Sequence, residues 1–165
     1  MFRTIRDFAD TWSYESEATL KILRALTGPA LSQSIVPGGR TLGRLAWHIV
    51  VSLPEMMQHA GLPVGGPDEH ALQPSLAEMI PQYERSARAL GEAVSRQWTD
   101  AMLVEAVAMY GEQWARGKVL AALVAHQAHH RAQMTVLMRQ AGLKVPGVYG
   151  PAAEEWAAMN LPAQP

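Results

Sequence analysis

Apolar residues recur at helical spacing in four long stretches of the chain. These stretches cover residues 4–26, 41–60, 75–97 and 116–141, and the last of them is the most regular. Recurrence at intervals of three and four residues places apolar side chains on one face of a helix. We therefore predict four helices, separated by segments that are rich in proline and glycine.

Capping and breaking residues bear on where these helices begin, bend and end. Ser75 and Glu78 have the spacing of a capping box, in which each side chain satisfies a free backbone donor. Pro81 follows closely and leaves open a kinked or later start. Pro54 lies inside the second helix and should kink it, because its ring lacks an N–H and crowds the preceding turn. Gly142 is suited to end the fourth helix.

The segment 98–115 is the least regular part of the sequence. We interpret it as a crossover loop that contains some helix, and we expect a short extra helix after Pro151, over residues 154–159. No stretch alternates apolar and polar residues for long enough to predict a strand. Four long helices without strands indicate an all-α protein, a four-helix bundle that forms one domain over residues 1–165.

The composition narrows the classes of function. Lys and Arg number 14 and Asp and Glu 15, with no run of like charge, so we expect no nucleic-acid partner. The absence of cysteine excludes disulfides and thiolate ligands and fits a cytoplasmic location. The N-terminus lacks the apolar core of a signal peptide. The apolar stretch 119–125 is far shorter than the ~20 residues that cross a membrane, so we expect no membrane partner.

Two histidines interrupt the apolar face of the fourth predicted helix. That face consists of Val119, Leu123, His126, His130, Gln133 and Leu137, spaced by 4, 3, 4, 3 and 4 residues. Adjacent polar groups on such a stripe are costly unless they have partners. His126 and His130 lie one turn apart, and two imidazoles in that relation can share one metal ion.

The stripe alone does not determine the complete set of ligands. His129 is also a helical neighbour of His126, but we favour His130 because it continues the apolar stripe, whereas His129 turns away from it. His48 lies beside the apolar stripe of the second helix and is a candidate third ligand, although a single such histidine is more often a core residue. Three neutral imidazoles suit zinc, nickel, copper or iron(II) and leave a coordination position open, as in catalytic sites.

Several motifs resemble those of one known family. The run His126-Gln127-Ala128-His129-His130-Arg131-Ala132-Gln133 is similar to the His-x-x-His-His-Arg-Gly-Gln signature of the DinB family, with alanine at 132 in place of glycine. The resemblance extends over nearly the whole chain. Further matches are Leu42-Gly43-Arg44-Leu45 before Trp47-His48, Met109-Tyr110-Gly111-Glu112, Trp114, and Pro146-Gly147-Val148-Tyr149-Gly150-Pro151.

The resemblance implies a particular architecture and site. The expected fold is a DinB/YfiT-like four-helix bundle with up-down-down-up topology, usually a homodimer. One divalent metal ion, commonly nickel or zinc, is expected at the base of a cleft, with His48, His126 and His130 as its ligands. Relatives of known activity are mostly metal-dependent transferases or isomerases that use low-molecular-weight thiols such as bacillithiol or mycothiol.

Together the residues and the resemblance predict a metal-dependent enzyme. Thiol transfer to an electrophilic small molecule or hydrolysis at the open metal position are the two reaction types we expect. Trp47, Tyr110 and Gln133 are candidate substrate-binding residues, and Gln133 could instead orient a metal ligand through a hydrogen bond. The pattern identifies no catalytic side chain. The alternative is a non-enzymatic, metal-stabilised stress or interaction module.

Overall fold

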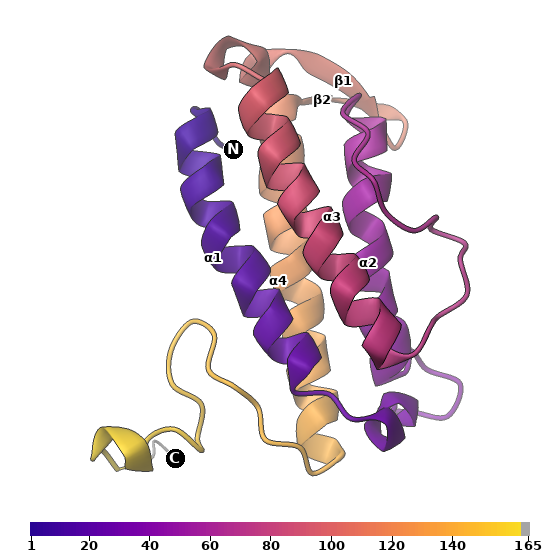
Figure 1. Cartoon of the computed structure of the whole chain (residues 1–165), viewed down its shortest axis with the longest axis vertical. Coiled ribbons are helices and arrows are strands. Elements are labelled where there is room, and N and C mark those ends of the chain that lie inside the picture. The colour runs from indigo at the N-terminus through magenta and orange to yellow at the C-terminus, as the bar shows by residue number, and fades with distance from the viewer. Residues whose placement is uncertain (163–165) are drawn as a thin grey trace.

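The computed structural model describes residues 1–162, and four long helices dominate it (Figure 1). These helices are α1 (Ile5–Arg24), α2 (Leu42–His59), α3 (Leu76–Gln97) and α4 (Arg116–Gln140). In the view of Figure 1, α1 and α4 run downwards while α2 and α3 run upwards. The all-α four-helix bundle that the sequence predicted is therefore confirmed, and so is the up-down-down-up topology that the resemblance implied.

Side-chain caps fix the starts of the middle helices. The Thr41 hydroxyl accepts the backbone N–H three residues further on at 3.1 Å and begins α2. The Glu78 carboxylate accepts the Ser75 backbone N–H at 3.1 Å, so α3 begins at the predicted capping box and not later. Pro54 and Pro81 lie inside α2 and α3, and each helix is assigned as one element through its proline.

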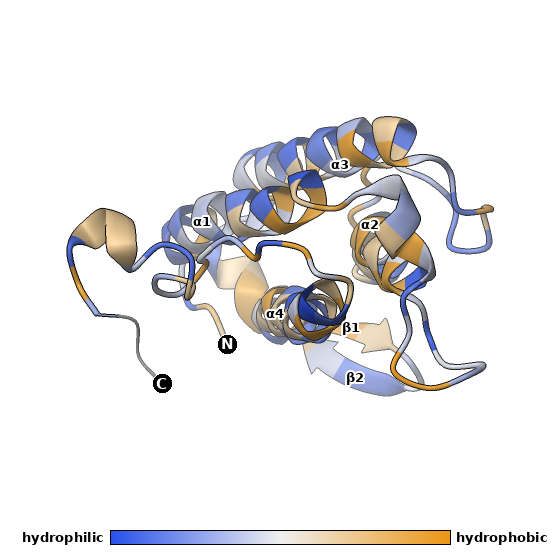
Figure 2. Ribbon diagram, turned by 90° about the horizontal axis from the view of Figure 1, so that it is seen from below, coloured by the Kyte–Doolittle hydropathy of each residue, from blue (hydrophilic) through white to orange (hydrophobic). Residues whose placement is uncertain are grey.

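The apolar faces of the helices meet in one interior. Seen along the bundle in Figure 2, the four helices surround this interior, and α1 packs mainly on α3 while α2 packs mainly on α4. Large, fully buried side chains from all four helices and the segment before β1 fill it: Trp47, Tyr83, Phe8, Ile22, Leu53, Leu90, Leu103 and Leu123. The pairing of α2 with α4 matters most here, because these two helices carry the candidate ligands. No helix within residues 1–162 is long and apolar enough to cross a membrane.

The segment between α3 and α4 contains a β-hairpin, which corrects the prediction that no strand is present. After a short 3-10 helix (Asp100–Val104), β1 (Ala106–Met109) pairs antiparallel with β2 (Glu112–Ala115). The two turn residues, Tyr110 and Gly111, have φ of 50° and 84°. Positive φ at both central residues is the type I′ geometry that matches the twist of a two-stranded hairpin. The hairpin lies at the top of the bundle in Figure 1.

The chain after α4 is mostly irregular. The extra helix expected over residues 154–159 is instead a turn followed by a single 3-10 turn, η3 (Ala157–Met159). Glu154 pairs with Arg139 on α4, and this pairing, together with a hydrogen bond from the Val145 N–H, lowers the pKa of the Glu154 carboxyl to about 2. The segment is thus attached to the end of the bundle by polar contacts more than by helix formation.

Candidate metal centre

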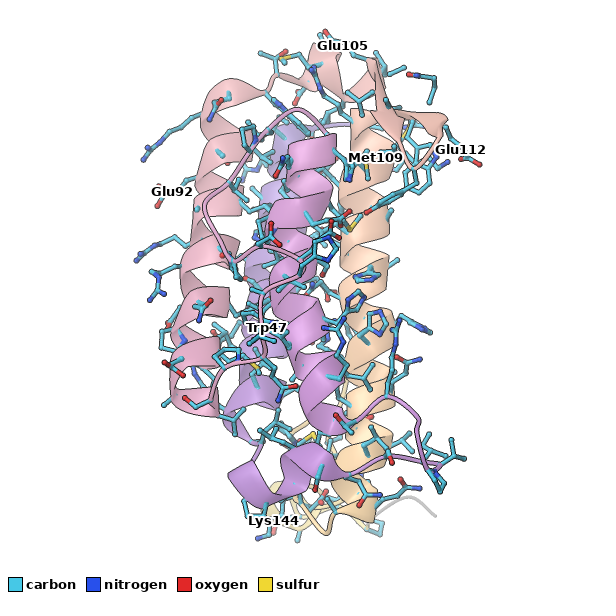
Figure 3. All side chains as sticks on the ribbon, turned by 90° about the vertical axis from the view of Figure 1, so that its right-hand side faces the viewer. Trp47, Glu92, Glu105, Met109, Glu112 and Lys144 are labelled. Atoms are coloured by element: carbon cyan, nitrogen blue, oxygen red, sulfur yellow. The ribbon has the colours of Figure 1, made fainter. Side chains whose placement is uncertain are left out.

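Three imidazoles converge between α2 and α4, the two helices that lie side by side in purple and pale orange in Figure 3. The Nε2 atom of His126 lies 3.1 Å from Nε2 of His48 and 3.1 Å from Nε2 of His130. His126 and His130 come from successive turns of α4, and His48 comes from the facing α2. The structure thus brings together the three histidines that the sequence singled out.

His129, the alternative ligand, lies outside this group. Its ring is 4.9 Å from that of His130, but the residue is exposed and does not belong to the cluster of potential ligand atoms. The helical phase explains the difference, because His130 follows His126 by four residues on the buried face whereas His129 is rotated towards solvent. His59 and His70 are exposed as well.

The spacing of the three nitrogens fits a small divalent cation. Zinc bound by imidazole has Zn–N distances of about 2.0–2.1 Å, so tetrahedral ligand nitrogens lie roughly 3.3 Å apart. The 3.1 Å separations around His126 are close to that value. Hydrogen bonding alone satisfies the group poorly, because one Nε2 proton on His126 cannot serve both neighbours. A cation at the centre would accept all three lone pairs, and the residues therefore fit a metal ion.

Gln133 selects the form of His130 that can bind a metal. Its Oε1 lies 2.7 Å from Nδ1 of His130, and an amide oxygen can only accept a hydrogen bond. Nδ1 therefore carries the proton, and Nε2 presents its lone pair to the other two rings. A hydrogen bond that fixes the tautomer and the ring orientation of a ligand is typical of metal-binding histidines.

Burial keeps the imidazoles neutral. Desolvation, followed by the charges of the neighbouring histidines, lowers the pKa of His48 and of His126 to about 4. The pKa of His130 is also lowered, mainly by burial, although its hydrogen bond to Gln133 opposes this shift. Neutral imidazole is the form that binds a metal, so at neutral pH no proton has to be displaced from these rings.

Replacing Gln133 by leucine should weaken metal binding by about 10- to 100-fold, the usual cost of losing a partner that orients a ligand. Gln133 is exposed, so the fold should be unaffected. The matched variant is Gln133→Glu, which keeps an acceptor for Nδ1 and should bind zinc at least as well as the wild type. Competition titration with a zinc chelator measures both affinities, and equal affinities for Gln133→Leu and wild type would argue against this role.

The other two candidate substrate-binding residues lie in different settings. Trp47 is 1% exposed, and its indole N–H donates to the Ala71 carbonyl at 2.8 Å. Tyr110 is exposed at the tip of the hairpin, where its hydroxyl donates to the Glu55 carboxylate at 2.9 Å. Desolvation and this carboxylate raise the Tyr110 pKa. A role in substrate binding stays a prediction for both residues, and in this conformation the Trp47 ring belongs to the core.

A buried ion pair directly behind the histidines was missed by the sequence analysis. Arg131 is 2% exposed and pairs with the Glu15 carboxylate, which is 6% exposed. Arg131 also donates to the Thr19 hydroxyl at 2.8 Å, and the Tyr149 hydroxyl donates to Glu15 at 2.8 Å. The pair therefore joins α4, α1 and the C-terminal segment at the residue next to His130. In the sequence, Glu15 and Thr19 follow Phe8 and Trp12 at spacings of three and four residues, and this is the signal that could have placed them on the inward face of the first helix.

Gln127, the residue after His126, holds the two ligand-bearing helices in register. Its amide nitrogen donates to the backbone carbonyl of Ile49, the residue after His48, at 3.2 Å. Its amide oxygen accepts hydrogen bonds from Thr19 at 3.3 Å and from Tyr83 at 3.2 Å. Because Gln127 is fully buried, these bonds are protected from competition with water. They fix the height of His126 relative to His48.

By its fold and site, the protein is a four-helix bundle with a three-histidine cluster between two facing helices. Comparison with known proteins gives the family: residues 1–164 match the DinB family. The chain is 44% identical over 164 residues to the uncharacterized protein YrdA of Bacillus subtilis (strain 168). The aligned region covers 99% of this chain and 98% of that relative. The chain therefore belongs to the DinB family.

Solved structures show the same fold. A DinB-like protein from Bacillus cereus ATCC 10987 superposes with a TM-score of 0.85 at 43% sequence identity, covering 90% of this chain and 100% of that chain. A DinB-like protein from Bacillus subtilis, YjoA, superposes with a TM-score of 0.67 at 13% identity, covering 88% of this chain and 99% of that chain. At this lower identity the likeness extends to the fold alone.

Proposed function

We propose that this DinB-family protein is a metal-dependent enzyme whose centre is one divalent ion held by His48, His126 and His130. The observation that carries the proposal is the convergence of three neutral Nε2 atoms at 3.1 Å contacts from two separate helices. Imidazole ligands of this number suit zinc or nickel among the divalent metals. The same three residues fit the tetrahedral spacing of a zinc site.

The count of ligands favours a catalytic site over a structural one. Within residues 1–162, no fourth histidine or carboxylate joins the cluster, whereas structural zinc sites are closed by four protein ligands. A bound ion would thus keep a position for substrate, and it would supply Lewis acidity that lowers the pKa of a water or thiol placed there. The apolar interior formed by all four helices would hold the fold without the metal.

The chain's own residues would position the reactants. Gln133 holds His130 in the metal-binding tautomer, and Gln127 keeps α4 aligned with α2. Two reaction types suit an open three-histidine site in a cysteine-free chain. One is transfer of a low-molecular-weight thiol to an electrophile, in which the thiol must come from a cosubstrate. The other is hydrolysis.

Assays with two probe reactions test this proposal. The zinc- or nickel-loaded protein should accelerate one of two reactions. The first is the substitution of 1-chloro-2,4-dinitrobenzene by a small thiol, in which a C–S bond replaces the C–Cl bond and chloride and the thiol proton are released. The second is the hydrolysis of 4-nitrophenyl acetate to acetate and 4-nitrophenol. Removing the metal should lower the rate roughly a thousandfold, which corresponds to the several kcal/mol that a metal contributes to a transition state. Equal rates with and without metal would contradict the proposal.

The non-enzymatic alternative makes the opposite prediction for stability. If the metal only stabilised the fold, its binding free energy would be folding free energy, and His130→Ala would greatly lower the melting temperature of the zinc-loaded protein. For a catalytic site, we expect this variant to keep its fold while it loses both metal and turnover. Thermal melting of the two proteins with and without zinc separates the two cases.

A further inference from the structure

A pocket of about 400 Å³ opens one helical turn away from the histidines, beside the N-terminal end of α2. Its walls are largely aliphatic. Ile35 and Val36 come from the loop before α2, Leu45 from α2 itself, and Val136 and Leu137 from α4. A volume in this range is typical of sites for small organic molecules.

Two lining residues connect this pocket to the candidate metal centre. Gln133 borders the pocket, and the same side chain is hydrogen-bonded to Nδ1 of His130 at 2.7 Å. Leu45 lies one turn before His48 on α2, which corresponds to about 5 Å along the helix. One end of the pocket therefore lies about one helical turn from His48 and borders the side chain that is hydrogen-bonded to His130.

The pocket contains a positive charge with no internal partner. Arg40 is the charged residue among those that line it, and no carboxylate in the described part of the chain forms an ion pair with Arg40. Arg40 is three residues before Gly43, at the start of α2, and its side chain borders the same pocket as Gln133. An unpaired guanidinium beside aliphatic walls is suited to bind a carboxylate.

The loop that forms the outer wall is held in a fixed shape. The Gly39 N–H donates to the Val36 carbonyl at 3.0 Å, and Gly38 has φ of 75° after Pro37, as in a type II turn. Apolar side chains on this turn are nevertheless uncovered, since Ile35 is 67% and Val36 57% exposed. A ligand tail that covers them would gain from burying apolar area.

From these contacts we propose that the pocket binds the substrate of the metal centre, and that this substrate is a small aliphatic carboxylate. Its carboxylate pairs with Arg40, and its aliphatic part lies against Ile35, Val36 and Val136. The assignment of this ligand as a substrate rests on the proposed function. The assignment of the pocket as a carboxylate site rests on its own geometry.

Octanoate is a suitable probe, with octan-1-ol as the uncharged molecule of the same length. Octanoate should bind the zinc-loaded wild type with one site per chain, and Arg40→Gln should weaken its affinity at least about tenfold, as expected for loss of a charged hydrogen bond. The matched control is Arg44→Gln. Arg44 also lies near His48 and contributes to its lowered pKa, but it does not line the pocket, so octanoate affinity should stay unchanged.

A second variant and a second state of the protein complete the test. Val136→Asp places a carboxylate in the pocket and should also weaken octanoate binding, while both pocket variants should still take up zinc. Equal octanoate affinities for Arg40→Gln and Arg44→Gln, or binding of octan-1-ol as tight as that of octanoate, would overturn the carboxylate site. The same titration on the zinc-free chain keeps the two proposals distinguishable. If the wild type fails to take up zinc, the proposed function and the substrate role are overturned. The assignment of the pocket as a carboxylate site is then tested by comparing the octanoate affinities of zinc-free wild type and zinc-free Arg40→Gln.

Discussion

Replacing Arg131 by methionine should lower the free energy of unfolding by about 3–5 kcal/mol, the cost of leaving a buried charge without its partner. The partner is the Glu15 carboxylate, which is 6% exposed. Among residues 1–162 it would keep the Tyr149 hydroxyl as its one remaining hydrogen-bond donor. Methionine is close to arginine in length and has no charge, so the change removes the ion pair while filling much of the same space. Urea denaturation measures the difference.

Two controls show whether the ion pair is the cause. Arg96→Met removes a guanidinium whose pairing with Glu92 is exposed, and exposed pairs contribute about 0–1 kcal/mol. The double variant Glu15→Leu/Arg131→Met removes both buried charges and should regain most of the lost stability, since no unpaired charge remains. If Arg131→Met costs no more than Arg96→Met, the buried pair does not stabilise the bundle as described.

The second large effect is expected at the metal centre, where His126→Ala should lower zinc affinity about a hundredfold or more. Apparent binding free energies of 10–16 kcal/mol for four-ligand zinc sites correspond to about 3 kcal/mol per ligand. His126 should matter most, because its Nε2 is in contact with both other rings. Competition titration against a chelator of known affinity gives the ratio.

His129→Ala is the matched control for this experiment. It removes an imidazole from the same helix, three residues from His126, but from an exposed position outside the cluster. Its zinc affinity should equal that of the wild type. A loss at His129 as large as the loss at His126 would mean that the ligand set is different, and that phasing along α4 selected the wrong histidine.

The helices could be predicted because each carries a repeated signal over many residues. The start of α3 and the positions of His126 and His130 follow from spacing within a single element. The assignment of His48 needed more, because nothing within α2 distinguishes a ligand from a core histidine. The resemblance to the family supplied it, and the packing of α2 on α4 now gives it a physical basis.

The hairpin could not be predicted for a local reason. Its strands, Ala106–Met109 and Glu112–Ala115, are four residues each, too short to show alternation. Its turn places a tyrosine at positive φ, whereas the usual sequence signal for such a turn is asparagine or aspartate before glycine.

Long-range polar contacts were hidden for a different reason. Arg131 and Glu15 are 116 residues apart in sequence. The pattern of residues within α4 does not indicate which residue of another helix will pair with the Arg131 charge. Arg40 lies in a loop, where the spacing of residues does not indicate in which direction a side chain points. Its relation to the histidines and to the pocket follows only from the fold of residues 33–42 onto α4.

Metal content is the most direct test of the claim that these three histidines form a metal centre. Untagged, metal-free protein would be incubated with one equivalent of zinc, desalted, and analysed for zinc by mass spectrometry. We expect about one zinc per chain for the wild type and for His129→Ala, and clearly less for His126→Ala, because this variant lacks one of the three ligands. A wild-type chain that retains less than about a tenth of an equivalent, and whose melting temperature does not change with zinc or nickel, would contradict the account.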